Sequence, residues 1–169
     1  TVSMNKPMEK YLESTMKLFS YYKDLGEKAL KQIPEEALFY QPNTESNSIA
    51  VIVKHLSGNM LSRWTDFLTS DGEKPWRQRD DEFMNSFSSK SEIMDAWQAG
   101  WQCLFSAFKN LSYEDLSKMV FIRNEGHYVV EAIQRQLAHV PYHIGQIVYI
   151  AKLLLARNGN HYLLHGINP

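Results

Sequence analysis

The sequence predicts an all-α protein built as a four-helix bundle, and three observations support this fold class. Apolar side chains recur at three- and four-residue steps along four long segments, as they do on the buried face of an amphipathic helix. No segment shows the sustained alternation of apolar and polar residues that is typical of strands. A connection of about 20 residues without any period joins the second segment to the third, which favours one long crossover over simple hairpins throughout.

The first helix is expected over residues 7–32. Pro7 suits a first helical turn because its missing N–H would have no partner there, and Pro34 ends the periodic segment. A stretch rich in Pro, Asn and Ser follows, and it ends at Ser48, a suitable N-cap. The second helix is therefore expected over residues 48–69.

The third helix is expected over residues 90–110, after the long connection. We interpret the acidic run Asp80, Asp81 and Glu82 in that connection as a solvated loop. The helix begins with a capping-box pattern, in which Ser89 and the glutamate three residues later each accept a backbone N–H of the other. After this helix, β-branched and aromatic residues followed by Asn-Glu-Gly predict a loop with at most a short hairpin.

The fourth helix is expected over residues 128–157, the longest apolar periodic segment, which ends at Asn158 and Gly159. Pro141 lies inside this segment. Because proline lacks the N–H group and its ring clashes with the preceding turn, the helix should bend or restart there. Residues 160–169 are expected to pack irregularly on the bundle.

Length and composition predict one domain over residues 1–169. A chain of this length buries roughly two thirds of its unfolded surface and needs no disulfides to fold. Cys103, the only cysteine, is expected to be a buried structural thiol. Eighteen Lys and Arg nearly balance nineteen Asp and Glu, which argues against nucleic-acid and membrane partners. No signal peptide or membrane-spanning stretch is recognisable, so we expect a soluble, cytoplasmic protein.

The most informative motif is HVPYH, which places His139 and His143 four residues apart in the last helix. Side chains at this spacing share one helix face, with about 5–6 Å between their Cβ atoms, so both rings can reach one metal ion. Gln136 and Gln146 lie on the same face, where buried polar groups are costly unless they are paired. Two interpretations stay open: the histidines are metal ligands, or they are core or rim side chains hydrogen-bonded to backbone or carboxylate groups.

His55 is the candidate for a third ligand. It lies on the second helix, and Asn59 and Arg63 follow it at helical spacing. A lone helical histidine is usually not a ligand, so this assignment depends on the second and fourth helices facing each other. His161 and His165 form another pair four residues apart, but they lie beyond the predicted helix, where nothing aligns their rings.

The order of four segments in this chain is similar to that of a known superfamily. The segments comprise residues 48–59, 76–80, 121–125 and 136–147. Together they resemble the DinB-like superfamily of metal-binding four-helix proteins, in particular its branch of uncharacterised small bacterial proteins. The resemblance implies an up-down-down-up helix order, a homodimer, and a divalent metal ion held by His55, His139 and His143. Characterised relatives are thiol-dependent transferases or isomerases that use a low-molecular-weight thiol.

The resulting hypothesis is a metal-dependent enzyme of the thiol-dependent S-transferase type that acts on a small molecule. Three imidazoles leave coordination positions open for water or a thiol, and they do not distinguish Zn, Ni, Fe and Mn. Helical spacing suggests Asn59, Arg63 and Gln146 as groups that contact the ligands or the substrate. No catalytic residue and no role for His127 is assigned. A metal-dependent hydrolase and a non-catalytic, dimeric metal-binding protein are the alternatives.

Overall fold

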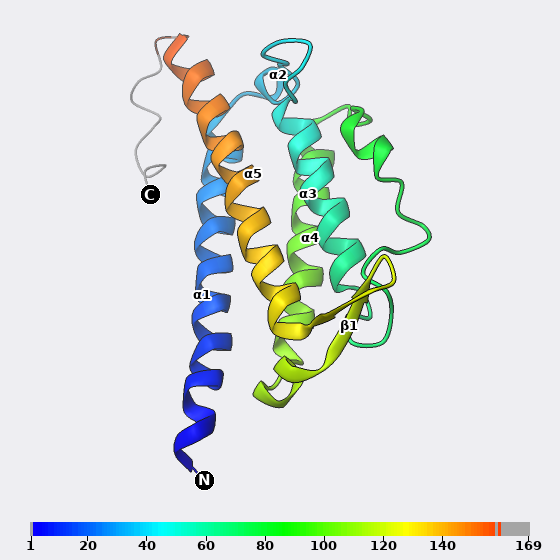
Figure 1. Cartoon of the computed structure of the whole chain (residues 1–169). Coiled ribbons are helices and arrows are strands. Elements are labelled where there is room, and N and C mark those ends of the chain that lie inside the picture. Colours follow the sequence, from blue (N-terminus) through cyan, green and yellow to red (C-terminus); the bar gives the residue numbers. More distant parts are fainter. Residues whose placement is uncertain (1, 158, 160–169) are drawn as a thin grey trace.

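Four long helices form the body of the computed structural model, which describes residues 2–157 and 159 (Figure 1). The long helices are α1 (Val2–Gln32), α3 (Ile49–Trp64), α4 (Lys90–Lys109) and α5 (Val129–Arg157). The short elements are α2 (Glu35–Leu38), the 3-10 helices η1 (Asp80–Phe83) and η2 (Tyr113–Ser117), and the strands β1 (Met119–Ile122) and β2 (Glu125–Tyr128). The predicted all-α bundle is confirmed, with one small antiparallel sheet added to it.

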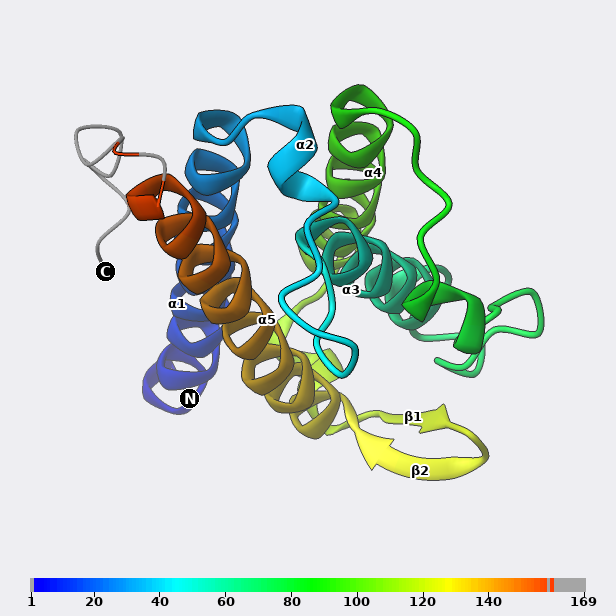
Figure 2. The ribbon, with the colours of Figure 1, turned by 90° about the horizontal axis from the view of Figure 1, so that it is seen from above.

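The helices follow an up-down-down-up order. Helix α4 begins where α1 ends, because Lys90 Nζ donates to the carbonyl oxygen of Ile33 at 2.7 Å. Helix α3 ends where α5 begins, because Trp64 Nε1 donates to Gln136 Oε1 at 3.0 Å. Viewed from above, α1 lies beside α5 and α3 lies beside α4, and these are the two most extensive helix pairings (Figure 2). Since α3 and α4 run in the same direction, the chain needs the long crossover between them.

Buried side chains from all four long helices form one apolar cluster, which contains Phe19, Leu56, Trp97 and Ile133. Helices α3 and α4 approach each other closely at Gly100, where an added Cβ would lie 2.9 Å from the Cα atom of Ser57. This close packing sets the position of α3 in the bundle, and α3 carries one of the candidate ligands.

The end of α3 differs from the prediction, which placed it at residue 69. The helix ends at Trp64, because Thr65 is extended and Asp66 has a positive φ of 46°. The Phe67 side chain is nevertheless buried against the core. An apolar position beyond the helix therefore continued the helical period, and the period alone overestimated the length of the helix.

Helix α5 continues across Pro141 without a restart. Of the two outcomes predicted at Pro141, a bend or a restart, the restart does not occur. Val140 and Ile144, on either side of the proline, are fully buried in the core. Packing on both sides of the missing hydrogen bond holds the helix in register, so residues four apart across Pro141 still share one face.

Hydrogen bonds hold the crossover, the segment that joins α3 to α4, along α3. Lys54 Nζ donates to the carbonyl oxygens of Asp81 (2.7 Å) and Met84 (2.8 Å). Lys74, which is buried, donates from Nζ to the carbonyl oxygen of Ser62 at 2.8 Å. These contacts place η1 against α3 and order a segment that has no periodicity of its own.

The strands β1 and β2 form the short hairpin that the sequence allowed. Arg123 and Asn124 link them with positive φ values of 54° and 62°, the conformation of a type I′ turn. The Asp71 carboxylate accepts both of their backbone N–H groups, each at 2.9 Å. Val120 and Ile122 are buried on the inner side of the hairpin. The hairpin is thereby tied to the crossover at the end of the bundle where α5 begins.

Within the described part of the chain, no helix combines the length and the apolar character that crossing a bilayer requires.

Candidate metal centre

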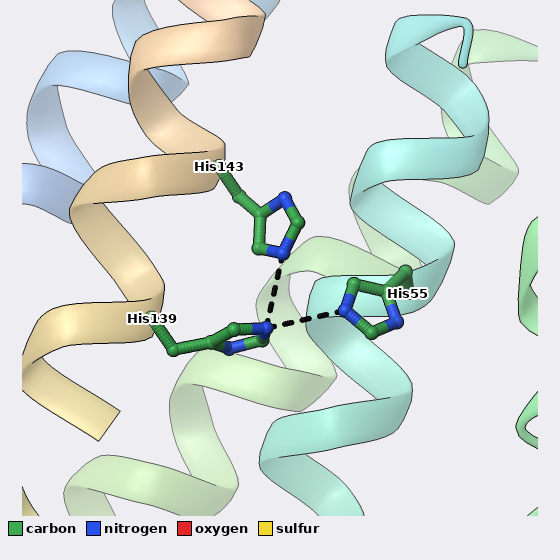
Figure 3. Close-up of side chains that lie close together, drawn as sticks. All are labelled: His55, His139 and His143. Carbon is green, nitrogen blue, oxygen red and sulfur yellow. Dashed lines mark hydrogen bonds between the residues drawn. The ribbon is translucent and has the colours of Figure 1, made fainter. Parts of the chain in front are cut away.

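Three histidines from two helices converge on one point between α3 and α5 (Figure 3). His139 Nε2 lies 3.2 Å from His55 Nε2 and 3.0 Å from His143 Nε2. One ring nitrogen of each histidine lies within 4.8 Å of the other two. His55 is buried, and the two histidines of α5 are partly buried. The predicted pair and the predicted third histidine are thus brought together.

The hydrogen bonds made by Nδ1 of His55 and of His143 determine where the lone pairs of their Nε2 atoms point. His55 Nδ1 lies 2.9 Å from a carboxylate oxygen of Glu82, and His143 Nδ1 lies 2.8 Å from the amide oxygen of Gln146. Both partners accept, so each Nδ1 carries a proton, and the neutral form of either ring directs an Nε2 lone pair inward. His139 Nε2 faces both lone pairs and has at most one proton to offer. The cluster therefore holds more inward-facing lone pairs than it has protons to satisfy them.

The three nitrogens suit a single divalent metal ion. Two ligands of a tetrahedral ion with bonds of about 2.05 Å lie about 3.3 Å apart, which is close to the two measured nitrogen separations. The other nitrogen of His139, Nδ1, has no hydrogen-bond partner among the described residues, so no contact fixes the tautomer of this ring, and the tautomer with a protonated Nδ1 presents a third Nε2 lone pair to the ion. A cation at the point of convergence would accept the nitrogen lone pairs that otherwise face one another.

The surroundings keep the rings of His139 and His143 neutral. Burial is the largest cause of the low pKa of His139, and together with the neighbouring His143 and His55 it lowers this pKa to about 3. Burial also lowers the pKa of His143, although the hydrogen bond to Gln146 partly opposes this effect. A metal ion binds only the neutral imidazole. At neutral pH the cluster therefore does not have to lose protons from these two rings before it can bind a cation.

Glu82 connects the cluster to a buried arginine. Its carboxylate accepts hydrogen bonds from Arg77 Nε at 2.7 Å and Arg77 Nη2 at 3.0 Å, in addition to the bond from His55. Burial by itself would raise the pKa of Glu82, but the hydrogen bonds from His55 and Arg77 prevail and lower it. Gly58 on α3 makes room for this carboxylate, because an added Cβ would overlap it. An ionised Glu82 thus orients His55 and keeps its proton on Nδ1.

The role of Glu82 was missed by the sequence analysis, which placed the acidic run 80–82 in a solvated loop. That interpretation is wrong for Glu82, which belongs to η1 and is buried. The ring of Phe83 also stacks on His55, with 4.7 Å between ring centroids. No spacing rule links these residues to His55, because they lie about 27 positions further along the chain, in the crossover. Their proximity depends on how the crossover folds along α3.

The other predicted site residues have different surroundings. Gln146 contacts a candidate ligand directly, as described above. Asn59 and Arg63 line a cavity that adjoins the cluster, and Arg63 also bonds the carbonyl oxygen of Gly72 at 2.6 Å. His127 lies apart from the cluster, 3.3 Å from Arg135 Nη1. The pair His161 and His165 lies outside the described residues, as does the predicted tail.

The adjoining cavity has a volume of about 260 Å³, and His55 and His139 form part of its wall. It lies between α3, α5, the hairpin and the crossover. Cys103 is not among its lining residues; the thiol is partly buried, not fully buried as expected, and it lies 3.4 Å from Thr65 Oγ1. The cavity gives a small molecule a route to the histidine cluster.

A family model described as "Protein of unknown function (DUF1572)" matches residues 6–164 of the chain. No curated protein and no solved structure matches the chain.

Proposed function

The chain belongs to the DUF1572 family of proteins of unknown function, and from its histidine cluster we propose that it is a divalent-metal-dependent enzyme. The observation that carries this proposal is the set of inward-facing Nε2 atoms of His55, His139 and His143. Glu82 and Gln146 hold two of these rings from behind, as acceptors commonly hold metal-binding histidines.

We also propose that this family lies within the DinB-like superfamily. Two features support the assignment. The four long helices run up-down-down-up, and the three histidines come from the second and fourth of them, as the sequence resemblance implies.

His55, His139 and His143 would hold the ion. A divalent ion with three imidazole ligands keeps coordination positions open, and it would lower the pKa of a thiol or water bound there. The other residues of the site orient the ligands and admit a substrate: Glu82 and Gln146 orient the rings, and the cavity beside His55 and His139 admits a small substrate.

The proposed reaction is transfer of a low-molecular-weight thiol to an electrophilic substrate. An attacking water must lose a proton, and a positioned general base typically contributes about 10²–10⁴-fold to such a step. None of the described residues lining the cavity is an aspartate or glutamate, and Glu82 is engaged by His55 and Arg77. A thiol must lose a proton as well, but its ordinary pKa of about 8.5 is far below the value of about 15.7 for water, so it depends less on a general base. The lack of a carboxylate among the described lining residues therefore favours thiol transfer over hydrolysis.

The first test measures metal content. Purified protein should contain about one divalent ion per chain, and His139→Ala or His143→Ala should remove most of it. His127→Ala is the matched control, because this histidine lies outside the cluster. Mass spectrometry of the metal content checks the result. Full metal retention in both cluster variants would refute the site.

The second test measures turnover. Metal-loaded and metal-free protein are assayed on a panel of an epoxide, an aryl halide and an activated alkene, with and without cysteine or glutathione. Turnover that requires both the metal and the thiol supports the proposed transferase. Metal-dependent cleavage of esters or amides without any thiol would instead identify a hydrolase.

A further inference from the structure

The arginines of this chain are concentrated around one cavity. The chain has six arginines, and five of them line the cavity beside the histidine cluster: Arg63, Arg77, Arg79, Arg123 and Arg135. No aspartate or glutamate is among the described residues that line it. This local excess of positive charge contrasts with the formal net charge of −1 for the whole chain. The cavity is therefore electrostatically suited to a negatively charged occupant.

Carboxylates behind the cavity wall neutralise only part of this charge. Glu73 lies 3.0 Å from Arg63, 3.4 Å from Arg77 and 3.2 Å from Arg123, while Glu82 pairs with Arg77. Five guanidinium groups against two carboxylates leave an excess of three positive charges.

Two arginines supply two of these three excess charges. Arg79 and Arg135 are exposed and have no carboxylate partner among the described residues. Burial lowers the pKa of Arg63; Glu73 opposes this effect, and the nearby Arg77 and Arg123 reinforce it. The like charges therefore repel one another in the absence of an anion.

Buried amide groups on the same wall also lack partners. Gln136 is 4 % exposed, and its amide oxygen accepts from Trp64, but its Nε2 has no hydrogen-bond partner among the described residues. Asn59 is 9 % exposed, and its Oδ1 also has no partner there. A buried polar group without a partner costs about 1–3 kcal/mol. Both groups line the cavity, so an acceptor group of a ligand is able to satisfy Gln136 Nε2, whereas Asn59 Oδ1 needs a donor group.

The remaining wall is apolar. Trp64, Phe67, Val120, Ile122 and Ala132 contribute side chains that are buried against the core. A wholly polar anion would leave this part of the wall without contacts. The lining thus matches a molecule with a charged end and an apolar body.

We propose that the cavity binds a small organic anion whose carboxylate or phosphate group pairs with the arginines and whose apolar body contacts Trp64 and Phe67. Arginine suits both kinds of head group, because its planar fork forms paired hydrogen bonds with either. Since His55 and His139 line the same cavity, the anion lies beside the proposed metal centre and has the position of a substrate. This last step rests on the proposed function, whereas anion binding itself does not.

Isothermal titration calorimetry of the full chain, as purified, tests the proposal with three probes of similar shape. Benzoate and phenylphosphate carry the two candidate head groups, and benzyl alcohol is the neutral control. We expect the better of the two anions to bind at least about tenfold more tightly than benzyl alcohol, and its affinity to fall as NaCl is added. Equal affinity for the anions and the alcohol would overturn the proposal. The tighter anion identifies the head group.

Arginine variants locate the binding site. Arg79→Gln and Arg135→Gln should each weaken binding of the tighter anion about fivefold to tenfold. Both side chains are exposed, so the fold should tolerate their replacement, which circular dichroism checks. Arg157→Gln is the matched control: this sixth arginine is exposed, donates to the Tyr40 hydroxyl at 3.1 Å, and lies outside the cavity. If all three variants bind the anion equally well, the site is refuted.

A histidine variant separates this proposal from the proposed function. His139→Ala should lose the metal but still bind the tighter anion within about threefold of the unmodified chain, because the arginines are intact. Loss of anion binding together with the metal would mean that the anion was a metal ligand, and it would overturn the arginine site. Retained anion binding in a protein that never contains metal would refute only the metal-dependent function.

Discussion

Replacing Glu82 by glutamine should weaken both metal binding and the fold. The carboxylate accepts three hydrogen bonds, one from His55 and two from Arg77. The side chains of His55 and Arg77 are only 8 % and 2 % exposed, so neither can turn to water. Glutamine has the same shape, but one of its terminal groups is a donor. At least one of the three buried donors then faces another donor and loses its bond.

The magnitude follows from these contacts. A hydrogen bond to a charged group contributes about 1.5–3 kcal/mol, and breaking a buried ion pair costs about 3–5 kcal/mol. Arg77 keeps a longer contact to Glu73, at 3.4 Å, which reduces the loss. We expect the free energy of unfolding to fall by about 2–4 kcal/mol. Metal affinity should fall about 10–100-fold, as it commonly does when the carboxylate behind a histidine ligand is removed.

Two assays measure the effects of Glu82→Gln separately. Urea unfolding followed by circular dichroism gives the stability of the metal-free protein, and competition with a chelating dye gives the metal affinity. Asp81→Asn is the matched control, since it removes a charge from the same 3-10 helix at an exposed position. If Glu82→Gln and Asp81→Asn have the same metal affinity within about twofold, the carboxylate does not orient a ligand and the reasoning is refuted.

Two further predictions concern the space and the protonation of the site. Gly58→Ala should displace the Glu82 carboxylate, which an added Cβ would overlap, and should lower metal affinity several-fold in the same dye assay. Gly145→Ala is its control, because apart from the adjoining residues and the nearby backbone of its own helix no described atom lies within 4 Å of the added Cβ there. Unchanged metal affinity in Gly58→Ala would contradict the packing argument. The pH dependence follows from His139, whose pKa of about 3 in the folded protein is below the usual value of about 6.5. The unfolded chain takes up this proton first, so the metal-free protein should lose stability, by at most about 5 kcal/mol, as the pH falls from about 6.5 towards 3. Urea unfolding across this range should show a weaker pH dependence for His139→Gln than for the unmodified chain, and identical slopes would count against the burial of a neutral ring.

Much of the bundle was predictable because amphipathic helices are local features. The ends of α4 and the C-terminal end of α1 lie within one residue of the predictions, since capping residues and prolines mark them. The end of α3 was not predictable from its period, because Phe67 is buried by tertiary packing after the helix has ended. The continuity of α5 at Pro141 likewise depends on the buried neighbours Val140 and Ile144. Tertiary contacts therefore decided these two departures. In a third, α1 begins at Val2 and not at the predicted residue 7, so Pro7 lies inside the helix and not in its first turn.

The candidate site likewise contains residues that the sequence predicted and residues that only the tertiary structure brings together. By itself, the sequence determined the all-α class, the long crossover and the pair His139 and His143, because helical spacing alone places two rings on one face. Only the tertiary structure decided that His55 meets this pair, that Glu82 lies behind His55, and that five arginines surround one cavity. These groups come from α3, the crossover, the hairpin and α5. No local period relates such distant segments, and the folded path of the crossover along α3 is what brings them together.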